Sequence, residues 1–271
     1  MLAHNRTLAF SSGLRSNPRK ASPWSGASLR TYNNLAIHQI RRRTNTKEIL
    51  RYLSENITPY LSSNLLCYSG TVDCLMIVTV ASFKGGVGKT TTAVHLAALL
   101  SGKAQTLLID DDPNRSASAW AEPGKLPFAV ILESERHRVQ IEYEHLVIDT
   151  PARADPADVK ALAKASDILV LPTTPEALAL TALLQMVRML GENRERVRVL
   201  LTVCPPFPEK DAEEARLMLK SEEIRVLNAQ VRRAKAFQKA ALAGQVVHEV
   251  ADPRAGMAWL DYVSAGKELG L

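Results

Sequence analysis

The feature that most constrains this chain is a glycine-rich loop between an apolar stretch of strand length and an apolar stretch of helical spacing. The loop reads Lys84-Gly85-Gly86-Val87-Gly88-Lys89-Thr90-Thr91. The β-branched run 76–81 precedes it, and residues 92–100 follow it with the spacing of a helix that Gly102 closes. A strand, a glycine loop ending in Lys-Thr and a helix, in this order, predict a phosphate-binding loop.

The residue types of this loop suit a nucleotide and its metal ion. Glycines let backbone N–H groups converge on phosphate oxygens without a Cβ in the way, and the helix N-terminus adds partial positive charge. Lys89 can reach the β- and γ-phosphates, and the Thr90 hydroxyl can ligate Mg²⁺. The alternative is a chance glycine turn, and the motif together with its context weighs against it. We therefore expect ATP to bind along residues 84–91.

The start of the loop departs from the strict pattern at two positions. Phe83 stands where the first glycine would be, and Lys84 adds a second lysine. In both respects the sequence resembles the ParA/MinD branch of phosphate-loop ATPases, whose deviant Walker A motif reads KGGxGK[ST]. The resemblance covers about residues 76–271. In that family the early lysine reaches across a dimer interface to the partner's nucleotide, so the resemblance implies that Lys84 and Lys89 are both catalytic in an ATP-bound homodimer.

Acidic residues follow the next apolar run, 106–109. The segment reads Asp110-Asp111-Asp112-Pro113-Asn114 where the family reads DxDPQ, so Asn114 departs from the usual glutamine. The resemblance implies that Asp112 lies near the attacking water and Asp110 near the Mg²⁺ shell. Taken alone, the segment could equally be an acidic turn at the end of a strand.

A further acid closes the apolar run 146–148. Asp149 gives the Walker B pattern, whose carboxylate holds Mg²⁺, often through water. The segment continues Asp149-Thr150-Pro151-Ala152, and family members commonly read DTPP or DTPA here. We expect Pro151 to end the strand and the next residues to sense the γ-phosphate.

Strands alternate with helices along the rest of the domain. Strands are predicted at 128–132, 168–171, 197–203 and 224–227, and helices at 116–121, 155–165, 176–190, 212–221, 234–243 and 255–269. This alternation predicts an α/β fold with a doubly wound, mainly parallel sheet and helices on both faces. Relatives bring residues from two late loops around the adenine, which makes Pro205, Pro206 and the turn 252–254 candidates.

The net charge of +6 is confined to the first part of the chain. Residues 1–75 hold ten Lys and Arg against three acids, so the remaining residues hold 24 against 25. The basic composition is therefore no evidence that the domain itself binds nucleic acid.

Residues 1–75 form a basic extension, rich in Ser and Arg, that we expect to be disordered, and 76–271 form the ATPase domain. The extension has three interpretations: a targeting segment such as an organellar transit peptide, a disordered basic arm, or an over-extended start before Met76. No stretch approaches the roughly 18–20 apolar residues of a membrane span.

Cysteine usage favours a reducing compartment. Cys67, Cys74 and Cys204 make no disulfide framework and no CxxC, which also argues against the iron–sulfur members of the superfamily. Cys204 is predicted to be a buried thiol. We expect a cytoplasmic protein associated with the nucleoid.

The resemblance implies an ATPase of ParA type that hydrolyses ATP to ADP and phosphate. Its ATP dimer would bind DNA non-specifically and position a plasmid, a chromosome region or a protein cargo, with a ParB-like or cargo adaptor protein stimulating hydrolysis. The candidate DNA contacts are the late basic residues Arg225, Arg232, Arg233, Lys235 and Lys239. An ordinary solvated helix start is the alternative for this cluster.

Two other functions fit the sequence less well. A MinD-like membrane-cycling ATPase needs a basic amphipathic helix at the C-terminus, but residues 259–269 hold one lysine and two acids. An ATPase of the superfamily that acts on a protein or metabolic substrate without binding DNA, such as a dethiobiotin-synthetase-like ligase, is not expected to need Lys84.

Overall fold

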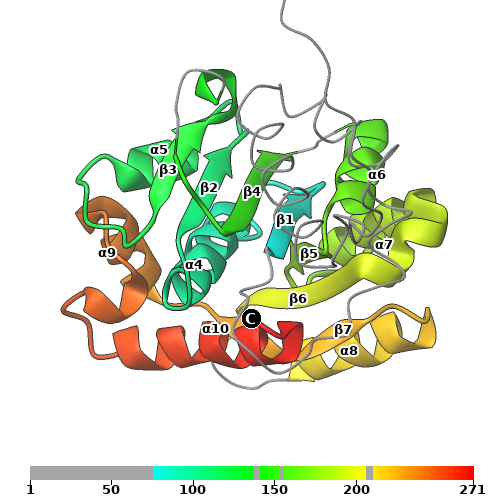
Figure 1. Cartoon of the computed structure of the whole chain (residues 1–271). Helices are drawn as coiled ribbons and strands as arrows, with labels where there is room; N and C mark the ends of the chain where they lie inside the picture. The colour runs from blue at the N-terminus through cyan, green and yellow to red at the C-terminus, as the bar shows by residue number, and fades with distance from the viewer. Residues whose placement is uncertain (1–75, 137–140, 153–154, 206–209) are drawn as a thin grey trace, which may run out of the picture. The chain divides into compact units, whose positions relative to one another are not determined.

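The computed structural model describes residues 76–136, 141–152, 155–205 and 210–271 (Figure 1). The predictions for residues 1–75 and for Pro206 lie outside these residues. Seven strands form one sheet in the order β3-β2-β4-β1-β5-β6-β7, and every neighbouring pair is parallel. The strands are β1 (Met76–Ser82), β2 (Thr106–Asp110), β3 (Ala129–Leu132), β4 (His145–Ala152), β5 (Ile168–Thr173), β6 (Val197–Cys204) and β7 (Val226–Arg232).

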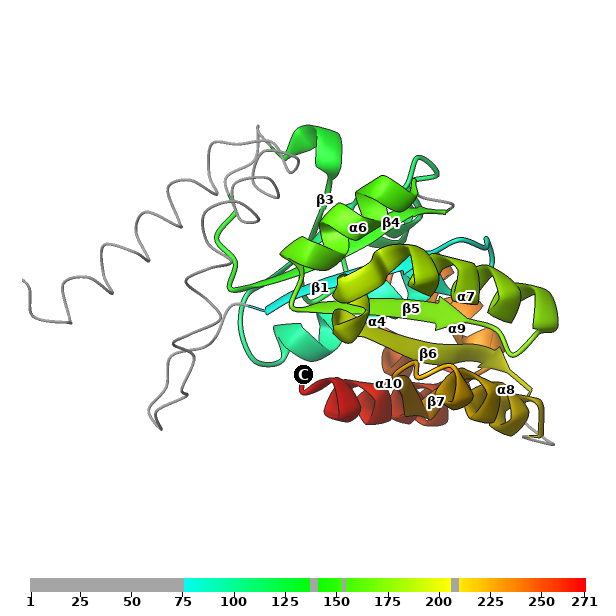
Figure 2. The ribbon, with the colours of Figure 1, turned by 90° about the vertical axis from the view of Figure 1, so that its right-hand side faces the viewer.

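Helices cover both faces of the sheet, so the predicted doubly wound α/β fold is confirmed (Figures 1 and 2). One face packs against α4 (Lys89–Ser101), α5 (Ser116–Ala121), α9 (Lys235–Ala243) and α10 (Ala255–Leu269). The other face packs against α6 (Pro156–Ala165), α7 (Ala177–Leu190) and α8 (Lys210–Ser221). Short 3-10 turns lie at η2 (Glu133–Glu135), η3 (Gly191–Arg196) and η4 (Val247–Glu249).

The central strand shows why both faces are covered. Val78 and Val80 of β1 are buried in the cluster with α4, whereas Ile77 and Ala81 are buried on the opposite face. Successive side chains of a strand point to opposite faces, so a strand that is apolar at every position must be buried on both. Because β1 lies at the centre of the order, the loop that follows it opens at the carboxyl end of the sheet where the strand order reverses.

The predicted bounds of β4 and β7 differ most clearly from those in the structure. β4 continues through Pro151 to Ala152, because the β1–β4 register shifts between Val80 and Ser82 and pairing then resumes between Ser82 and Ala152. β7 runs from Val226 to Arg232, whereas the prediction placed the strand at 224–227. The Ile224 N–H instead bonds the Leu219 carbonyl and closes α8, so this residue ends a helix although it is apolar.

A buried histidine ties the C-terminal helix to the helix after the loop. His95 of α4 stacks on Tyr262 of α10 at 4.7 Å between ring centroids. Its Nδ1 lies 2.6 Å from the Thr91 carbonyl and its Nε2 accepts the Val247 N–H at 3.2 Å, so the neutral ring is fully bonded. Burial lowers its pKa to about 4. His95 therefore serves in packing α4 against α10, and these contacts account for its burial without a bound metal.

Candidate nucleotide site

The glycine loop connects β1 to α4 at the carboxyl end of the sheet. Gly86 and Gly88 have φ of 78° and 77°, a conformation that costs glycine little and strains other residues. A Cβ added at Gly85 or Gly86 would find no atom within 4 Å, so one side of the loop is open. The loop thus has the exposed backbone that phosphate binding requires.

Lys89 lies at the centre of a buried charge cluster beneath the loop. Its Nζ donates to Asp149 Oδ1 at 2.7 Å and to Asp112 Oδ2 at 3.0 Å. The side chains of Lys89, Asp112 and Asp149 are only 7%, 6% and 0% exposed. One lysine faces two carboxylates, so the cluster retains negative charge that a cation would neutralise.

The two carboxyl groups differ in their pKa. Burial raises the pKa of Asp149, although the charge of Lys89 and hydrogen bonds from Lys89 and Thr90 oppose it. Burial also acts to raise the pKa of Asp112, but hydrogen bonds from Asn114 and Lys89 outweigh that effect and hold the pKa below its ordinary value. Asp112 is thus the more firmly ionised of the two.

The donor set around Asp149 fits Mg²⁺. Thr90 Oγ1 donates to Asp149 Oδ2 at 2.7 Å, which brings together a hydroxyl and a carboxylate, both ligands that Mg²⁺ accepts. Among the described residues, no three His, Cys, Asp or Glu side chains are arranged to hold a metal by themselves. A magnesium ion here would therefore complete its shell with water and nucleotide oxygens, as Mg²⁺ usually does.

Asp110, the last residue of β2, uses one carboxylate oxygen for the acidic turn and the other for α5. Oδ1 accepts the Asp112 N–H at 3.2 Å, and Oδ2 accepts both the N–H and the hydroxyl of Ser118 at 2.8 Å. Asp110 also lies near enough to Asp149 for its charge to raise the pKa of that group. The structure thus brings Asp112, Asp149 and Thr90 to Lys89, while Asp110 holds the loop that carries Asp112.

Lys84 lies apart from the buried cluster. Its Nζ bonds Glu176, the residue before α7, at 2.7 Å, and the two side chains are 37% and 63% exposed. This hydrogen bond and the charge of Lys84 lower the pKa of Glu176. The two lysines of one loop therefore have different environments: Lys89 faces inward and Lys84 makes an exposed ion pair.

Sequence reasoning missed three residues that support the site. Asn114 donates to Asp112 Oδ1 from both its backbone N–H and its side chain, each at 3.0 Å. Glu176 pairs with Lys84 across 92 positions, and Thr202 bonds the Val87 carbonyl across 115 positions. Only Asn114 carried a local signal, its departure from the family's glutamine.

The candidate adenine residues are only partly described. Pro205 follows β6 at the same end of the sheet and is half-buried. In the late turn, Asp252 accepts the Arg254 N–H at 2.9 Å and pairs with Lys239 at 2.8 Å.

The five candidate DNA contacts do not form one patch. Arg225 precedes β7 and donates to the Glu195 carbonyl, whereas the other four lie at or beyond the opposite end of that strand. Arg232 pairs with Asp261, which is 7% exposed, and Asp261 also accepts the Arg232 N–H. This pair attaches the edge strand β7 to α10. Arg233 lies close enough to Glu176 for its charge to lower the pKa of that carboxyl.

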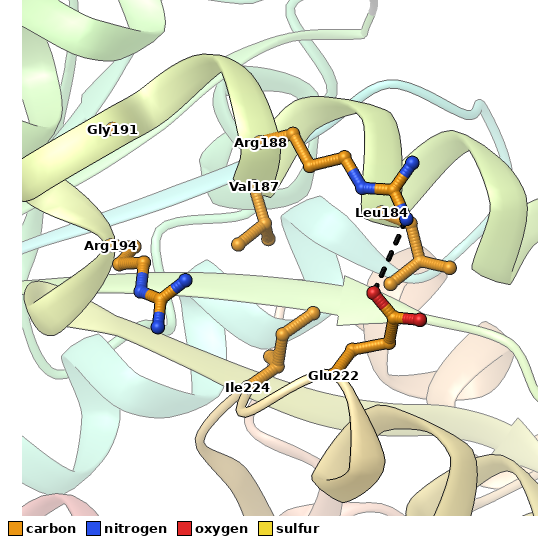
Figure 3. Close-up of a pocket in the computed structure, with 7 residues that line it drawn as sticks. All are labelled: Leu184, Val187, Arg188, Gly191, Arg194, Glu222 and Ile224. Atoms are coloured by element: carbon orange, nitrogen blue, oxygen red, sulfur yellow. Dashed lines mark hydrogen bonds and ion pairs between the residues drawn. The ribbon is translucent and has the colours of Figure 1, made fainter.

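A cavity of about 470 Å³ lies at the amino end of the sheet, far along α7 from the loop. Figure 3 shows Val187, Leu184 and Ile224 around it, with charged side chains at its margin. Arg188 pairs with Glu222 at 3.2 Å, and these side chains are 70% and 42% exposed. Its lining residues are Leu184, Val187, Arg188, Gly191, Arg194, Glu222 and Ile224. It contains none of the loop residues or acids of the nucleotide site.

The parallel sheet, the open glycine loop after its central strand and the buried Lys89 define a phosphate-loop nucleotide-binding protein. Residues 78–247 match the family described as the CobQ/CobB/MinD/ParA nucleotide binding domain, so the chain belongs to that family. The resemblance predicted from the loop is confirmed, and with it membership of a family of ATPases.

Similar proteins include positioning and partition proteins. The chain is 39% identical over 201 residues to "Maintenance of carboxysome distribution protein A" of Gloeobacter kilaueensis, covering 71% of this chain and 93% of that protein. It is 33% identical over 131 residues to "Protein ParA" of Rhizobium radiobacter, covering 45% of this chain and 59% of that protein.

Solved structures share the fold. Apo McdA from Cyanothece superposes with a TM-score of 0.56 at 18% identity, covering 70% of this chain and 99% of that chain. A chain of the MinC:MinD cell division protein complex of Aquifex aeolicus superposes with a TM-score of 0.55 at 16% identity, covering 72% of this chain and 96% of that chain. Within the described residues, no helix is both long and apolar enough to cross a membrane.

Proposed function

We propose that this protein is a Mg²⁺-dependent ATPase that dimerises when it binds ATP and uses hydrolysis to position a large cargo. The observation that carries the proposal is the buried cluster of Lys89, Asp112 and Asp149 beneath an open glycine loop. A buried lysine between two carboxylates at a loop with exposed glycines is an arrangement suited to a phosphate and its counter-ion.

Each residue of the cluster has a separate task. Phosphoryl transfer depends mainly on positioning and on electrostatic stabilisation of the phosphate oxygens. Lys89 would face the β- and γ-phosphates, and Asp112, whose lowered pKa keeps it ionised, would orient the attacking water. Thr90 and Asp149 would hold Mg²⁺, which neutralises charge on the phosphates when bound.

Lys84 supplies the dependence on a second subunit. In its own chain this lysine pairs with Glu176 outside the buried cluster. On dimerisation it would leave Glu176 and reach the partner's nucleotide, where another cation stabilises the charge of the transition state. Hydrolysis would then require the dimer, which makes the ATPase a timer for assembly and release.

We infer that the cargo is a protein assembly rather than a plasmid or a chromosome region. The relative named for carboxysome distribution is matched over 93% of its length, whereas the ParA relative is matched over 59%. The ATP dimer would hold non-specific DNA through Arg233 and Lys235, which lie beyond β7 at the carboxyl end of the sheet. The protein would thus use the nucleoid as a track and an adaptor on the cargo as the trigger for hydrolysis.

Light scattering of the full chain with Mg²⁺ and either ATP or ADP tests the dimer. We expect a dimer with ATP and a monomer with ADP, most clearly in Asp112→Ala, which should bind ATP without hydrolysing it. Proteins recovered with that variant would identify the adaptor. A monomer in both nucleotides would contradict the proposal, and a dimer without DNA affinity would restrict the track to a protein scaffold.

A further inference from the structure

The strand β6 contains one extra residue where it passes the glycine loop. Leu201 pairs with Gln230 of β7, and Cys204 pairs with Arg232, so three steps along β6 match two steps along β7. This mismatch is a β-bulge at Thr202 and Val203. Val203 has a φ of 55°, in the left-handed region.

The conformation of Val203 is costly. A β-branched residue at positive φ is a genuine outlier, because its two Cγ atoms crowd the backbone. Such strain persists only where the surrounding structure imposes it, and it occurs preferentially at functional sites. The bulge is therefore a feature that the fold maintains against the local preference of its sequence.

Thr202 faces the side of the sheet opposite to Val199 and Leu201, the side on which Leu200 packs with α4. Val199 and Leu201 face the cluster with α7, and the extra residue returns Cys204 to that same face. Thr202, which is 1% exposed, lies against the loop, and its hydroxyl bonds the Val87 carbonyl at 2.7 Å and the Thr173 carbonyl at 3.1 Å.

The contact with Val87 fixes a peptide that is important for phosphate binding. In a planar trans peptide the N–H points opposite to the C=O. Because Thr202 holds the Val87 carbonyl on the β6 side, the N–H of Gly88 is turned away from β6. Gly88, at φ 77°, precedes α4, so this N–H belongs to the donors available at the loop.

We propose that Thr202, which lies beside the bulge at Val203, is a positioning residue for the phosphate loop. The hydroxyl holds the Val87–Gly88 peptide in its binding orientation before the nucleotide arrives, which lowers the ordering cost of binding. The inference rests on residues 84–91 being the nucleotide loop, and it adds β6 to the elements that set nucleotide affinity.

The test compares two buried threonines in the full chain, with binding of fluorescently labelled ADP as the readout. Thr202→Val should weaken binding roughly threefold to tenfold, the effect of losing one hydrogen bond. Thr79→Val is the matched control, since Thr79 is 0% exposed on β1 and bonds Ser166 at 2.6 Å. Both changes should lower the melting temperature, but only Thr202→Val should weaken binding.

Two further variants keep the proposal testable if Thr202→Val does not fold. Thr202→Ser keeps the hydroxyl and should bind the nucleotide within about twofold of wild type. Val203→Gly accepts the left-handed conformation without strain and should also keep its affinity. Unchanged affinity in folded Thr202→Val, equal weakening in Thr79→Val, or weakening in either Thr202→Ser or Val203→Gly would overturn the proposal. Failure of ADP to bind wild-type protein would instead refute the nucleotide site itself.

Discussion

The described ion pairs at the two ends of the sheet differ in how deeply they are buried. At the carboxyl end, Lys89 is 7% exposed between two carboxylates that are 6% and 0% exposed. At the amino end, Arg188 and Glu222 are 70% and 42% exposed. Burying charges costs desolvation energy, so buried charges are kept mainly where they are paired or serve a function. Exposed pairs contribute only about 0–1 kcal/mol. Burial of charge therefore distinguishes the two ends.

A cavity of small-molecule size lies away from the glycine loop. The cavity beside Arg188 has about 470 Å³, within the range of small-molecule sites. The nucleotide loop instead presents an open surface of backbone, where a Cβ at Gly85 or Gly86 would meet nothing. Phosphate sites built from a loop and a helix N-terminus need exposed donors rather than enclosed volume.

Replacing Lys89 should have the largest effect. Lys89→Met removes the cation between Asp112 and Asp149, so we expect ATP binding to be lost and the free energy of unfolding to fall by about 3 kcal/mol at neutral pH. Calorimetric titration with ATP and chemical denaturation measure the two effects.

Lowering the pH should partly restore the stability of Lys89→Met. The pKa of Asp149 is already raised by burial, so the folded variant binds a proton at a higher pH than the unfolded chain does. Stability therefore rises as the pH falls toward that raised pKa. If Lys89→Met bound ATP normally or kept its stability, the buried charges at the carboxyl end of the sheet would not differ in function from the exposed pair at the amino end.

Replacing Lys84 should separate binding from hydrolysis. Lys84→Gln should still bind ATP, because this lysine lies outside the buried cluster, while hydrolysis falls by roughly 100-fold or more, as for a lost trans cation. Glu176→Gln is the control: it frees Lys84 without removing it and should retain hydrolysis. Steady-state ATPase assays with parallel titrations measure both, and wild-type turnover in Lys84→Gln would contradict a catalytic role.

The two arginines that flank β7 offer a matched test of the DNA surface. Arg233→Glu, at the carboxyl end, should weaken duplex binding by the ATP state uniformly across sequences and flatten the salt slope by about 1. Arg225→Glu, at the amino end, should leave both unchanged. Fluorescence anisotropy with unrelated duplexes at several salt concentrations measures this, and equal effects from both substitutions would place the DNA surface elsewhere.

The smallest effect is expected at the cavity. Arg188→Met removes an exposed partner of Glu222, so the free energy of unfolding should change by less than about 1 kcal/mol and ATPase activity should not change. Denaturation and turnover measurements check this. A large loss of activity would show that the amino end belongs to the site.

Local patterns in the sequence were sufficient for most of the fold. The glycine loop from Lys84 to Thr91, the acids at the carboxyl ends of β2 and β4, and the alternation of strands with helices are all short-range features, and the structure contains each of them. The buried Cys204 was also predicted correctly. Such elements can be predicted from the sequence because each strand or helix buries side chains at a regular spacing along the chain.

Pairing between distant elements could not be predicted in this way. Pro151 stays in β4 because β1 shifts register beside it, and β7 starts late because Ile224 closes α8. The Lys84–Glu176 pair and the Thr202–Val87 bond join residues 92 and 115 positions apart. A register shift or a long-range hydrogen bond leaves no periodic trace, so these contacts require the three-dimensional structure.

The claim that most needs testing is that Lys84 acts on the partner's nucleotide. The measurement is the ATPase rate of an equal mixture of Lys84→Gln and Asp112→Ala, each inactive alone. In a mixed dimer, the site that keeps Asp112 receives Lys84 from the other subunit and is complete. We expect about a quarter of the wild-type rate, because about half of randomly formed dimers are mixed and each has one complete site. If Lys84 acted within its own chain, no site in the mixture would be complete, and an inactive mixture that still forms dimers would contradict the account.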